Sequence, residues 1–445
     1  MHLDVRTNDS DDVAPGDRVI HRLAWVLLHQ VVGRGSVFAF FALLPLWLPL
    51  EAAGAFALAY STMQMVFQPA FDTAVNTMLV RAVARGDWTT VGRVVQWTLA
   101  LLGVLLTAGV AAVATAGVAP LWSWLAGYFA LSLPLNMAFA ICRGRGRFDV
   151  EGIVGSLQKL SLLPLLWATP ASASAPAQAL FLSAIFGWTV FATGFGPAWR
   201  GERAVPPVQP AGPFIHTAPL RETLYLTALA AAALLYLRID LVLLGAFSGL
   251  RDVGVYATAS RWMEAAFVLP VGFMLVLFPR LSSRPFQSGE LRFAFRLFST
   301  VAVVTFAGSL AVAWFLIPVV YRGAVGQQLA RLVLLLSPCA IAVCFGTLFS
   351  QTLVAWGRTP LALAAALVGL GAKLTIAGAA IPRMGTTGAA LASVGTEVAV
   401  AVASAVLLRR VMHEQRPVHS PSGSPPVDPI ERRRPARHTG APASS

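Results

Sequence analysis

Long apolar stretches recur along almost the whole chain, and they restrict its fold more than any other feature. Runs such as those within 92–117 and 386–411 are long enough to cross a hydrocarbon core of about 30 Å as helices. Only 12% of the 445 residues are charged, against roughly 25% in an average soluble domain. These runs do not alternate as the strands of a β-barrel would, and backbone groups in lipid must be satisfied internally. The sequence therefore predicts an all-α, polytopic membrane protein.

Twelve transmembrane helices are predicted, in two lobes of six related by a pseudo-twofold axis along the membrane normal. They lie near 20–50, 53–80, 92–117, 119–142, 151–169, 177–198, 221–248, 253–279, 293–320, 327–352, 359–381 and 386–411. The polar, proline-rich segment 199–220 falls midway and is interpreted as a linker. We therefore expect a disordered N-terminal segment (1–19), an N-lobe (20–198), a cytoplasmic linker (199–220), a C-lobe (221–412) and a disordered tail (413–445).

Arginines are concentrated in the connections that follow even-numbered spans. These connections carry Arg81, Arg85, Arg93, Arg143, Arg145, Arg147, Arg200, Arg203, Arg221, Arg280, Arg284, Arg292 and Arg296. The opposite connections hold little beyond Arg251, Arg322 and Arg383. By the positive-inside rule, the even-numbered connections and both termini are cytoplasmic.

Two echoes in the sequence indicate that the halves are related. Gly54, Phe56, Ala57, Ala59, Met63 and Phe67 recur two hundred residues later as Gly254, Tyr256, Ala257, Ala259, Met263 and Phe267. The tripeptide Lys159, Leu160 and Ser161 in the fifth span is similar to Lys373, Leu374 and Thr375 in the eleventh. Six spans per half, with both halves starting inside, imply parallel repeats, an arrangement that alternating-access transporters use.

Ionisable side chains inside a span cost about 2.5 to 3.5 kcal/mol on insertion scales, so each is a candidate functional residue. The candidates are Arg34, Asp72, Lys159, Arg238, Asp240, Arg261, Glu264, Lys373 and Glu397. Arg34 and Arg238 lie about 18 Å and 25 Å along their spans, too deep to reach the membrane interface easily. Asp72 and Arg261 are nearer helix ends, where extension to the interface is an equal alternative.

Spacing within a helix indicates which charges can pair locally. Arg261 and Glu264 are three residues apart and share a helix face, so a structural ion pair and a ligand site remain equally open. Arg238 and Asp240 are two apart and point in different directions. Each of them therefore needs a separate partner or a watery cavity.

Arg34, Lys159 and Lys373 have no acidic residue nearby on their own predicted helices. A polar cavity shared by cations from both lobes is the economical account of all three. Such a cavity selects anions, and guanidinium groups suit the paired oxygens of phosphate or diphosphate. We therefore expect a phosphorylated cargo, because a lipophilic cation would be repelled.

The sequence contains no glycine-rich phosphate loop, no HExxH motif and no histidine or cysteine set with metal-ligand spacing. A net charge of +13 could indicate nucleic acid, but topology accounts for the arginines. The sequence therefore predicts a non-enzyme without cofactor, metal site or nucleic-acid partner.

Two segments carry a resemblance to a known family: LLYLRIDLVLLG from Leu234, and VGVYATASRWMEAAFVLPVGFMLVLFPRLS from Val253. They resemble polysaccharide flippases, which export O-antigen and other lipid-linked oligosaccharides, within the multidrug/oligosaccharidyl-lipid/polysaccharide exporter superfamily. The matching motifs are an R-x-D, a G-x-Y-x-x-A and a closing F-P. Further matches are Phe71, Asp72, Arg81, Gln351, Ala355, Gly357, Arg358, Gly385, Gly388 and Ala389.

The resemblance implies a V-shaped pair of lobes around a cationic cavity. Its cargo would be an oligosaccharide on a polyprenyl diphosphate, moved by alternating access across the bacterial cell (inner) membrane for surface polysaccharide biosynthesis. Carried over residue by residue, the site would bind the diphosphate or sugar through Arg34, Lys159, Arg238, Arg261 and Lys373. Asp240 and Glu397 would bind a coupling cation, Na⁺ or H⁺.

The expected partners are the anionic lipid-linked oligosaccharide, membrane lipids, and a polysaccharide polymerase and glycosyltransferases, with the chain itself a monomer. Two alternatives share the fold: a cation-coupled multidrug exporter and a flippase for the peptidoglycan-precursor lipid. A membrane scaffold or glycan polymerase is a third alternative, although polymerases usually carry one large extracytoplasmic loop.

Overall fold

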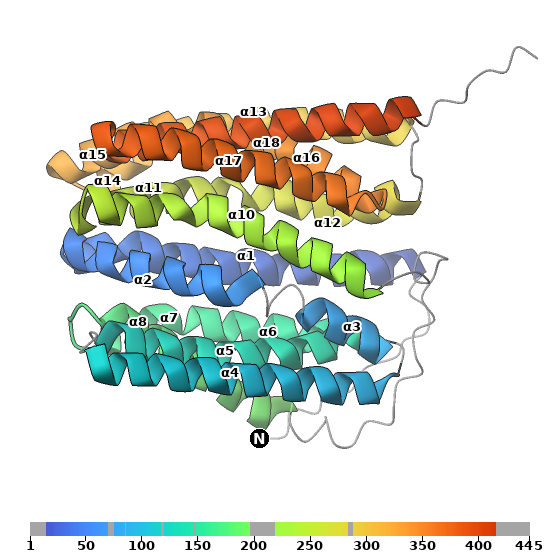
Figure 1. The fold of residues 1–445 in the computed structure, drawn as a ribbon, viewed down its shortest axis with the longest axis horizontal. Helices are drawn as coiled ribbons and strands as arrows, with labels where there is room; N and C mark the ends of the chain where they lie inside the picture. Colours follow the sequence, from blue (N-terminus) through green and yellow to red (C-terminus); the bar gives the residue numbers. More distant parts are fainter. Residues whose placement is uncertain are drawn as a thin grey trace, which may run out of the picture.

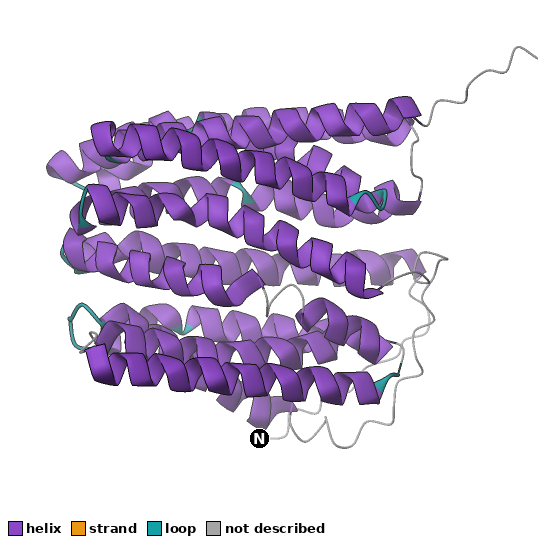
Figure 2. Ribbon diagram, in the orientation of Figure 1, coloured by secondary structure: helices purple, strands orange, loops and turns teal. Residues whose placement is uncertain are grey.

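The computed structural model describes residues 15–69, 75–84, 86–116, 120–145, 147–195, 219–283 and 288–414. All regular elements in these ranges are helices, in agreement with the predicted all-α fold (Figure 2). Asp72, most of the predicted linker and most of both predicted terminal segments lie outside the described residues.

The described residues of the first half form α-helices and one π-helical turn. They are α1 (Pro15–Trp47), α2 (Leu50–Gln68), α3 (Asn76–Ala84), α4 (Trp88–Ala116), α5 (Pro120–Gly144), α6 (Phe148–Leu160), α7 (Leu162–Ala168), α8 (Ala175–Val190) and the π-helical turn η2 (Phe191–Phe195). In order and position they match the first six predicted spans, with α2 and α3 forming the second and α6 and α7 the fifth.

The second half matches the other six spans in the same way. Its elements are α10 (Pro219–Phe247), α11 (Leu250–Ala266), α12 (Val268–Ser283), α13 (Ser288–Ala311), the π-helical turn η4 (Val312–Leu316), α14 (Ile317–Val320), α15 (Gly323–Leu336), α16 (Pro338–Ala355), α17 (Thr359–Met384) and α18 (Thr386–Glu414). The break before α16 falls at Pro338, which has no N–H to continue the helix. Gly249 and Gly385 have φ of +88° and +54°, which lets α10 and α17 turn sharply into the helices that follow.

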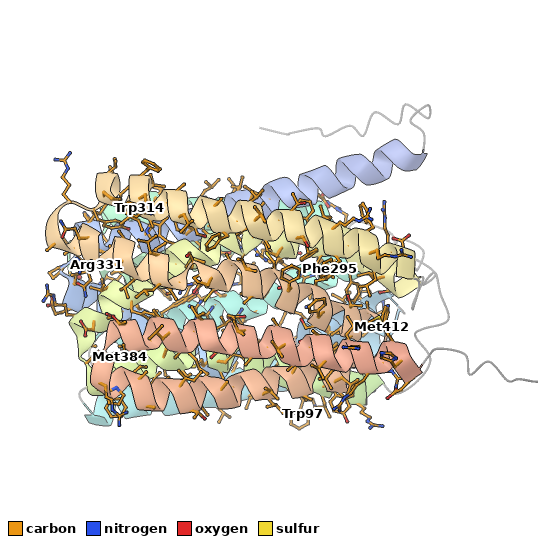
Figure 3. All side chains as sticks on the ribbon, turned by 90° about the horizontal axis from the view of Figure 1, so that it is seen from above. Trp97, Phe295, Trp314, Arg331, Met384 and Met412 are labelled. Carbon is orange, nitrogen blue, oxygen red and sulfur yellow. The ribbon has the colours of Figure 1, made fainter. Side chains whose placement is uncertain are left out.

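The outer faces of the helices are apolar. Trp97, Trp167, Trp314 and Phe315 expose between 66% and 77% of their surface (Figure 3 labels Trp97 and Trp314). Within the described residues, seven helices are long and apolar enough to cross a membrane. Exposed apolar surface on this scale is what a lipid-facing protein presents, because a monomeric soluble protein rarely exposes large apolar patches.

The helices run side by side, with α1 and α2 between the other helices of the first half and those of the second (Figure 1). The halves meet mainly where α2 crosses α11. A Cβ on Gly54 would lie 1.9 Å from the carbonyl oxygen of Leu250, and a Cβ on Gly254 would lie 2.2 Å from that of Leu50. The contact is reciprocal, as expected where two repeats meet across a twofold axis. The repeated glycines therefore mark the point of closest approach between the halves.

Candidate functional site

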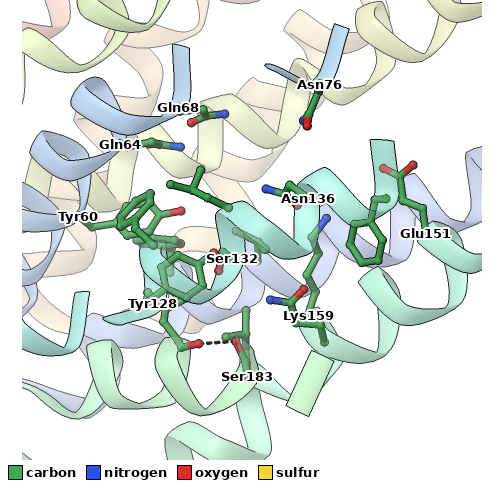
Figure 4. Close-up of a pocket in the computed structure, with 18 of the residues that line it drawn as sticks. Tyr60, Gln64, Gln68, Asn76, Tyr128, Ser132, Asn136, Glu151, Lys159 and Ser183 are labelled. Carbon is green, nitrogen blue, oxygen red and sulfur yellow. Dashed lines mark hydrogen bonds between the residues drawn. The ribbon is translucent and has the colours of Figure 1, made fainter. Parts of the chain in front are cut away.

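A cavity of about 340 Å³ lies within the first half, where α1 and α2 separate from α5, α6 and α8. Amide side chains contribute much of its wall (Figure 4): Gln64, Gln68, Asn76, Asn136 and Gln158. Hydroxyl groups add Tyr60, Tyr128, Ser132 and Ser183. Its volume is in the range of small-molecule sites, but its lining is more polar than that of most such sites.

Two helices supply most of these groups in regular stripes. Tyr60, Gln64 and Gln68 follow one another at four-residue intervals along α2. Tyr128, Ser132 and Asn136 do the same along α5. Residues four apart lie on one face of a helix, so two polar stripes face the same space.

Four oxygen atoms in this wall are buried without a hydrogen-bond partner among the residues that the structure describes. They are Gln64 Oε1, Gln68 Oε1, Asn76 Oδ1 and Ser132 Oγ. Buried polar atoms are nearly always hydrogen-bonded, and leaving one unpaired costs about 1 to 3 kcal/mol. Four such oxygens around one cavity indicate a site for a ligand or waters that donate hydrogen bonds.

The charges at the cavity are few. Arg143 is paired with Glu151 at 2.6 Å. Lys159 is exposed and lines the cavity, and its Nζ would lie 3.3 Å from a Cβ on Gly33 of α1. Lys159 therefore brings positive charge to a wall whose other described lining residues carry no net charge.

Aromatic rings form part of the cavity wall. Phe41 and Tyr60 have ring centroids 5.2 Å apart, and Tyr60 and Phe129 are 5.9 Å apart. Such rings offer flat apolar faces beside the amides and hydroxyls. The combination suits a ligand with both hydroxyl groups and C–H surfaces.

A second polar cluster is buried in the other half. Lys373 of α17 is 1% exposed, and its Nζ lies 2.8 Å from Asp240 Oδ2 of α10. Tyr256 donates to the same oxygen at 2.5 Å, and Ser393 Oγ lies 2.6 Å from the Lys373 Nζ. Glu397, one turn along α18, lines the same small cavity of about 40 Å³.

A third cluster lies where the halves meet. Arg238 of α10 binds Glu264 of α11 through two contacts, Nη1–Oε1 at 2.6 Å and Nη2–Oε2 at 3.2 Å. Arg261 Nη1 lies 2.7 Å from Glu264 Oε2. The guanidinium of Arg261 also stacks on the ring of Phe41 in α1, 4.1 Å from its centroid. This cluster therefore touches the aromatic wall of the first cavity.

The structure thus distributes the predicted site residues over three places and does not bring them into one chamber. Lys159 lines the cavity of the first half, Arg238 and Arg261 share Glu264, and Lys373 pairs with Asp240. Arg34 is exposed on α1 beside Gly33 and lines neither described cavity. The sequence predicts that Lys373 shares one polar cavity with Arg34 and Lys159, because its own helix carries no nearby acidic residue. Its ammonium instead pairs with Asp240, 133 residues away in sequence on the adjacent helix α10.

The sequence analysis missed the amides, because it looked for ionisable residues inside the predicted spans and amide side chains are neutral. The four-residue spacing of Tyr60, Gln64 and Gln68 is a signal that could have found them.

No family model matches the chain, and a search of curated proteins finds no similar sequence. Solved structures of MATE transporters share its fold. A mutant of the Vibrio cholerae MATE transporter VcmN superposes with a TM-score of 0.62 over 90% of this chain and 98% of the transporter, at 13% identity. An inward-facing multidrug resistance MATE family transporter of the MOP superfamily gives 0.61 over 91% and 96%, at 14% identity. A MATE in the bent conformation gives 0.64 over 88% and 95%, at 14% identity. The chain therefore has the fold of the MATE transporters.

Proposed function

We propose that the protein is a transporter that exports an oligosaccharide linked to a polyprenyl diphosphate by alternating access. The observation that carries this proposal is the amide-lined cavity with four unpartnered oxygens. Sugar hydroxyls donate hydrogen bonds to such oxygens, and aromatic faces pack against the C–H faces of sugar rings. The cavity chemistry therefore supports a carbohydrate cargo.

The diphosphate would be recognised outside this cavity, at the cations beside it. Lys159 stands at the cavity itself, while Arg238 and Arg261 lie behind its aromatic wall. Guanidinium groups bind phosphate oxygens in pairs. Arg34 completes the proposed cationic set on α1, and the lipid tail would remain in the bilayer.

The main alternative is a multidrug exporter, which the fold of the solved MATE transporters makes the natural second candidate. An unpaired carboxylate in the cavity would favour a lipophilic cation. Among the described lining residues of the large cavity, Glu151 is the one carboxylate, and Arg143 neutralises it at 2.6 Å. The lining therefore favours a neutral, hydroxyl-rich ligand. A flippase for the peptidoglycan-precursor lipid shares this cargo chemistry and is distinguished by the glycan that is moved.

Coupling to a cation is proposed at Glu397 in preference to Asp240. The Asp240 carboxylate already has the Lys373 ammonium at 2.8 Å, which occupies the position where Na⁺ would bind. We propose that both termini are cytoplasmic, as the positive-inside rule predicts from the arginines. The resemblance to polysaccharide flippases supports a location in the inner membrane of a bacterial cell.

Transport of a fluorescent lipid-linked oligosaccharide in proteoliposomes tests the proposal. Replacing Gln64 and Gln68 with Leu removes two hydrogen-bond acceptors, while the side chains keep a similar volume. Each lost hydrogen bond of about 1 kcal/mol should weaken sugar binding roughly fivefold. We expect transport at subsaturating cargo to fall by about an order of magnitude or more. The control is Val66→Leu, an exposed position on the same helix, which should transport normally. Wild-type protein that moves ethidium but no lipid-linked sugar would instead establish the drug exporter.

A further inference from the structure

In the Arg238–Glu264–Arg261 cluster, two guanidinium groups form an anion-binding site that the Glu264 carboxylate occupies but does not fully satisfy. Two guanidinium groups share one carboxylate, so the three groups keep a net charge of +1. Arg238 is 6% exposed, and its Nε has no hydrogen-bond partner among the described residues. A buried N–H donor without an acceptor is costly. The cluster therefore has both charge and a donor left for a further anionic oxygen.

A diphosphate satisfies this cluster better than Glu264 does. Glu264 offers two oxygens and one negative charge, and both oxygens are already used by the guanidinium groups. A diphosphate carries more oxygens and more charge, and each of its phosphates can accept a pair of N–H bonds from one guanidinium. It can therefore serve Arg238 and Arg261 separately.

The cluster is also part of the contact that holds the halves together. Arg261 belongs to α11 in the second half and stacks on Phe41 of α1 in the first. Beside it, Trp262 packs edge-on against Phe38 with centroids 4.8 Å apart. Tyr321 donates a hydrogen bond to the carbonyl oxygen of Ala42. A change in the partner of Arg261 therefore acts directly on the interface between the halves.

The cluster and the sugar cavity share a wall. Phe41 and Tyr60 both line the cavity with ring centroids 5.2 Å apart, and the guanidinium of Arg261 lies 4.1 Å from the ring centroid of Phe41. A ligand with its sugar in the cavity and its diphosphate a few bonds away would place that anion beside Glu264.

We propose that Glu264 is a built-in competing anion: the cargo diphosphate displaces its carboxylate from Arg238 and Arg261, and Arg261 then leaves Phe41 so that the halves can separate. This inference rests on the proposed function. It assigns Glu264 a role in selecting a doubly anionic headgroup, because a ligand without that charge cannot displace the carboxylate. It also makes substrate binding the event that loosens the contact between the halves.

Binding of farnesyl diphosphate to the purified full-length protein tests the displacement, with farnesol as the uncharged probe. Glu264→Gln removes the competing charge, so we expect farnesyl diphosphate to bind about tenfold more tightly than to wild type, with farnesol unaffected. Glu414→Gln removes the same charge at an exposed position on α18 and should leave the affinity unchanged. If Glu264→Gln does not fold, Glu264→Asp retains the charge but cannot span both guanidinium groups, and should tighten binding by a smaller factor.

Spin labels at Leu46→Cys and Val319→Cys report on the contact between the halves, since both positions are exposed and lie near Ala42 and Tyr321 in the chain. The native cysteines in the described residues are buried. Farnesyl diphosphate, but not farnesol, should lengthen the distance between the labels. Equal or weaker binding by Glu264→Gln, or binding with no change in this distance, overturns the inference. The proposed function is judged separately: wild-type protein that flips lipid-linked oligosaccharide retains it even then.

Discussion

At the scale of single residues, two buried cations of this protein are paired with carboxylates on other helices. Lys373 reaches Asp240 across 133 positions, and Arg238 reaches Glu264 across 26. Arg238 and Asp240 are two residues apart in sequence but pair with different residues, Glu264 and Lys373. Isolated charges in lipid are too costly to persist, so each helix carrying one must pack against a helix carrying the other sign.

The Lys373–Asp240 pair leads to a stability prediction. Lys373→Met leaves the Asp240 carboxylate, 2% exposed, without its counter-charge, and breaking a buried pair costs about 3 to 5 kcal/mol. We expect a clear fall in the thermal unfolding midpoint in detergent. Lys159→Met changes the only other lysine of the chain, which is exposed at its cavity, and should have little effect.

Adding Asp240→Asn to Lys373→Met provides the cross-check. The double variant removes both charges of the pair, leaves Glu397 in this cavity, and should recover much of the lost stability. Equal midpoints for wild type and Lys373→Met would show that the pair does not stabilise the fold.

At the scale of elements, two features depend on helix periodicity. The polar stripes of α2 and α5 face one cavity because their members recur every four residues. The crossing of α2 and α11 depends on the absence of side chains at Gly54 and Gly254. Backbone can approach backbone this closely only where a helix carries a small residue.

The close helix crossing predicts that a glycine-to-alanine substitution destabilises the protein at Gly254 but not at Gly371. Gly254→Ala puts a Cβ 2.2 Å from the Leu50 carbonyl oxygen, so the helices must move apart, at a cost of about 1 to 3 kcal/mol. Gly371→Ala on α17 meets nothing within 4 Å and should be neutral or slightly stabilising, because alanine is the better helix former. Thermal unfolding compares the two. A Gly254→Ala protein as stable as Gly371→Ala would show that the crossing tolerates a wider separation.

At the scale of the whole molecule, the halves pack together through α1, α2, α10 and α11 (Figure 1). The described residues that line the large cavity all belong to the first half, on one side of this contact. Alternating access in the proposed transporter requires the contact to open and another to form. The membrane potential then acts on the charge that the cargo carries across.

The proposed cargo charge predicts a voltage dependence. Two negative charges moving outward across an inside-negative potential of 100 mV gain up to roughly 4.6 kcal/mol. In proteoliposomes, a potential imposed by a potassium gradient and valinomycin, negative on the side of the arginine-rich connections, should speed transport toward the opposite side. The reversed potential should slow it. A rate that does not depend on the sign of the potential would exclude a net anionic cargo.

Much of the fold could be predicted from the sequence, because the membrane imposes it. Apolar runs of sufficient length must be helices, and the order and position of the helices agree with the predicted spans. The shared glycines of α2 and α11 were visible as a repeat. The candidate site was predicted only as a set of ionisable residues. Which of these residues pair with one another could not be predicted, because the pairing depends on which helices are adjacent.

What the sequence determined by itself is the all-helical architecture, its division into related halves and the residues that carry buried charge, since each follows from hydropathy, spacing or desolvation cost. The tertiary structure alone decided that Lys373 meets Asp240, that two arginines share Glu264, and that amides of α2 and α5 enclose a cavity. These outcomes depend on helix packing, and packing is set by the shapes of many side chains at once, which no local pattern encodes.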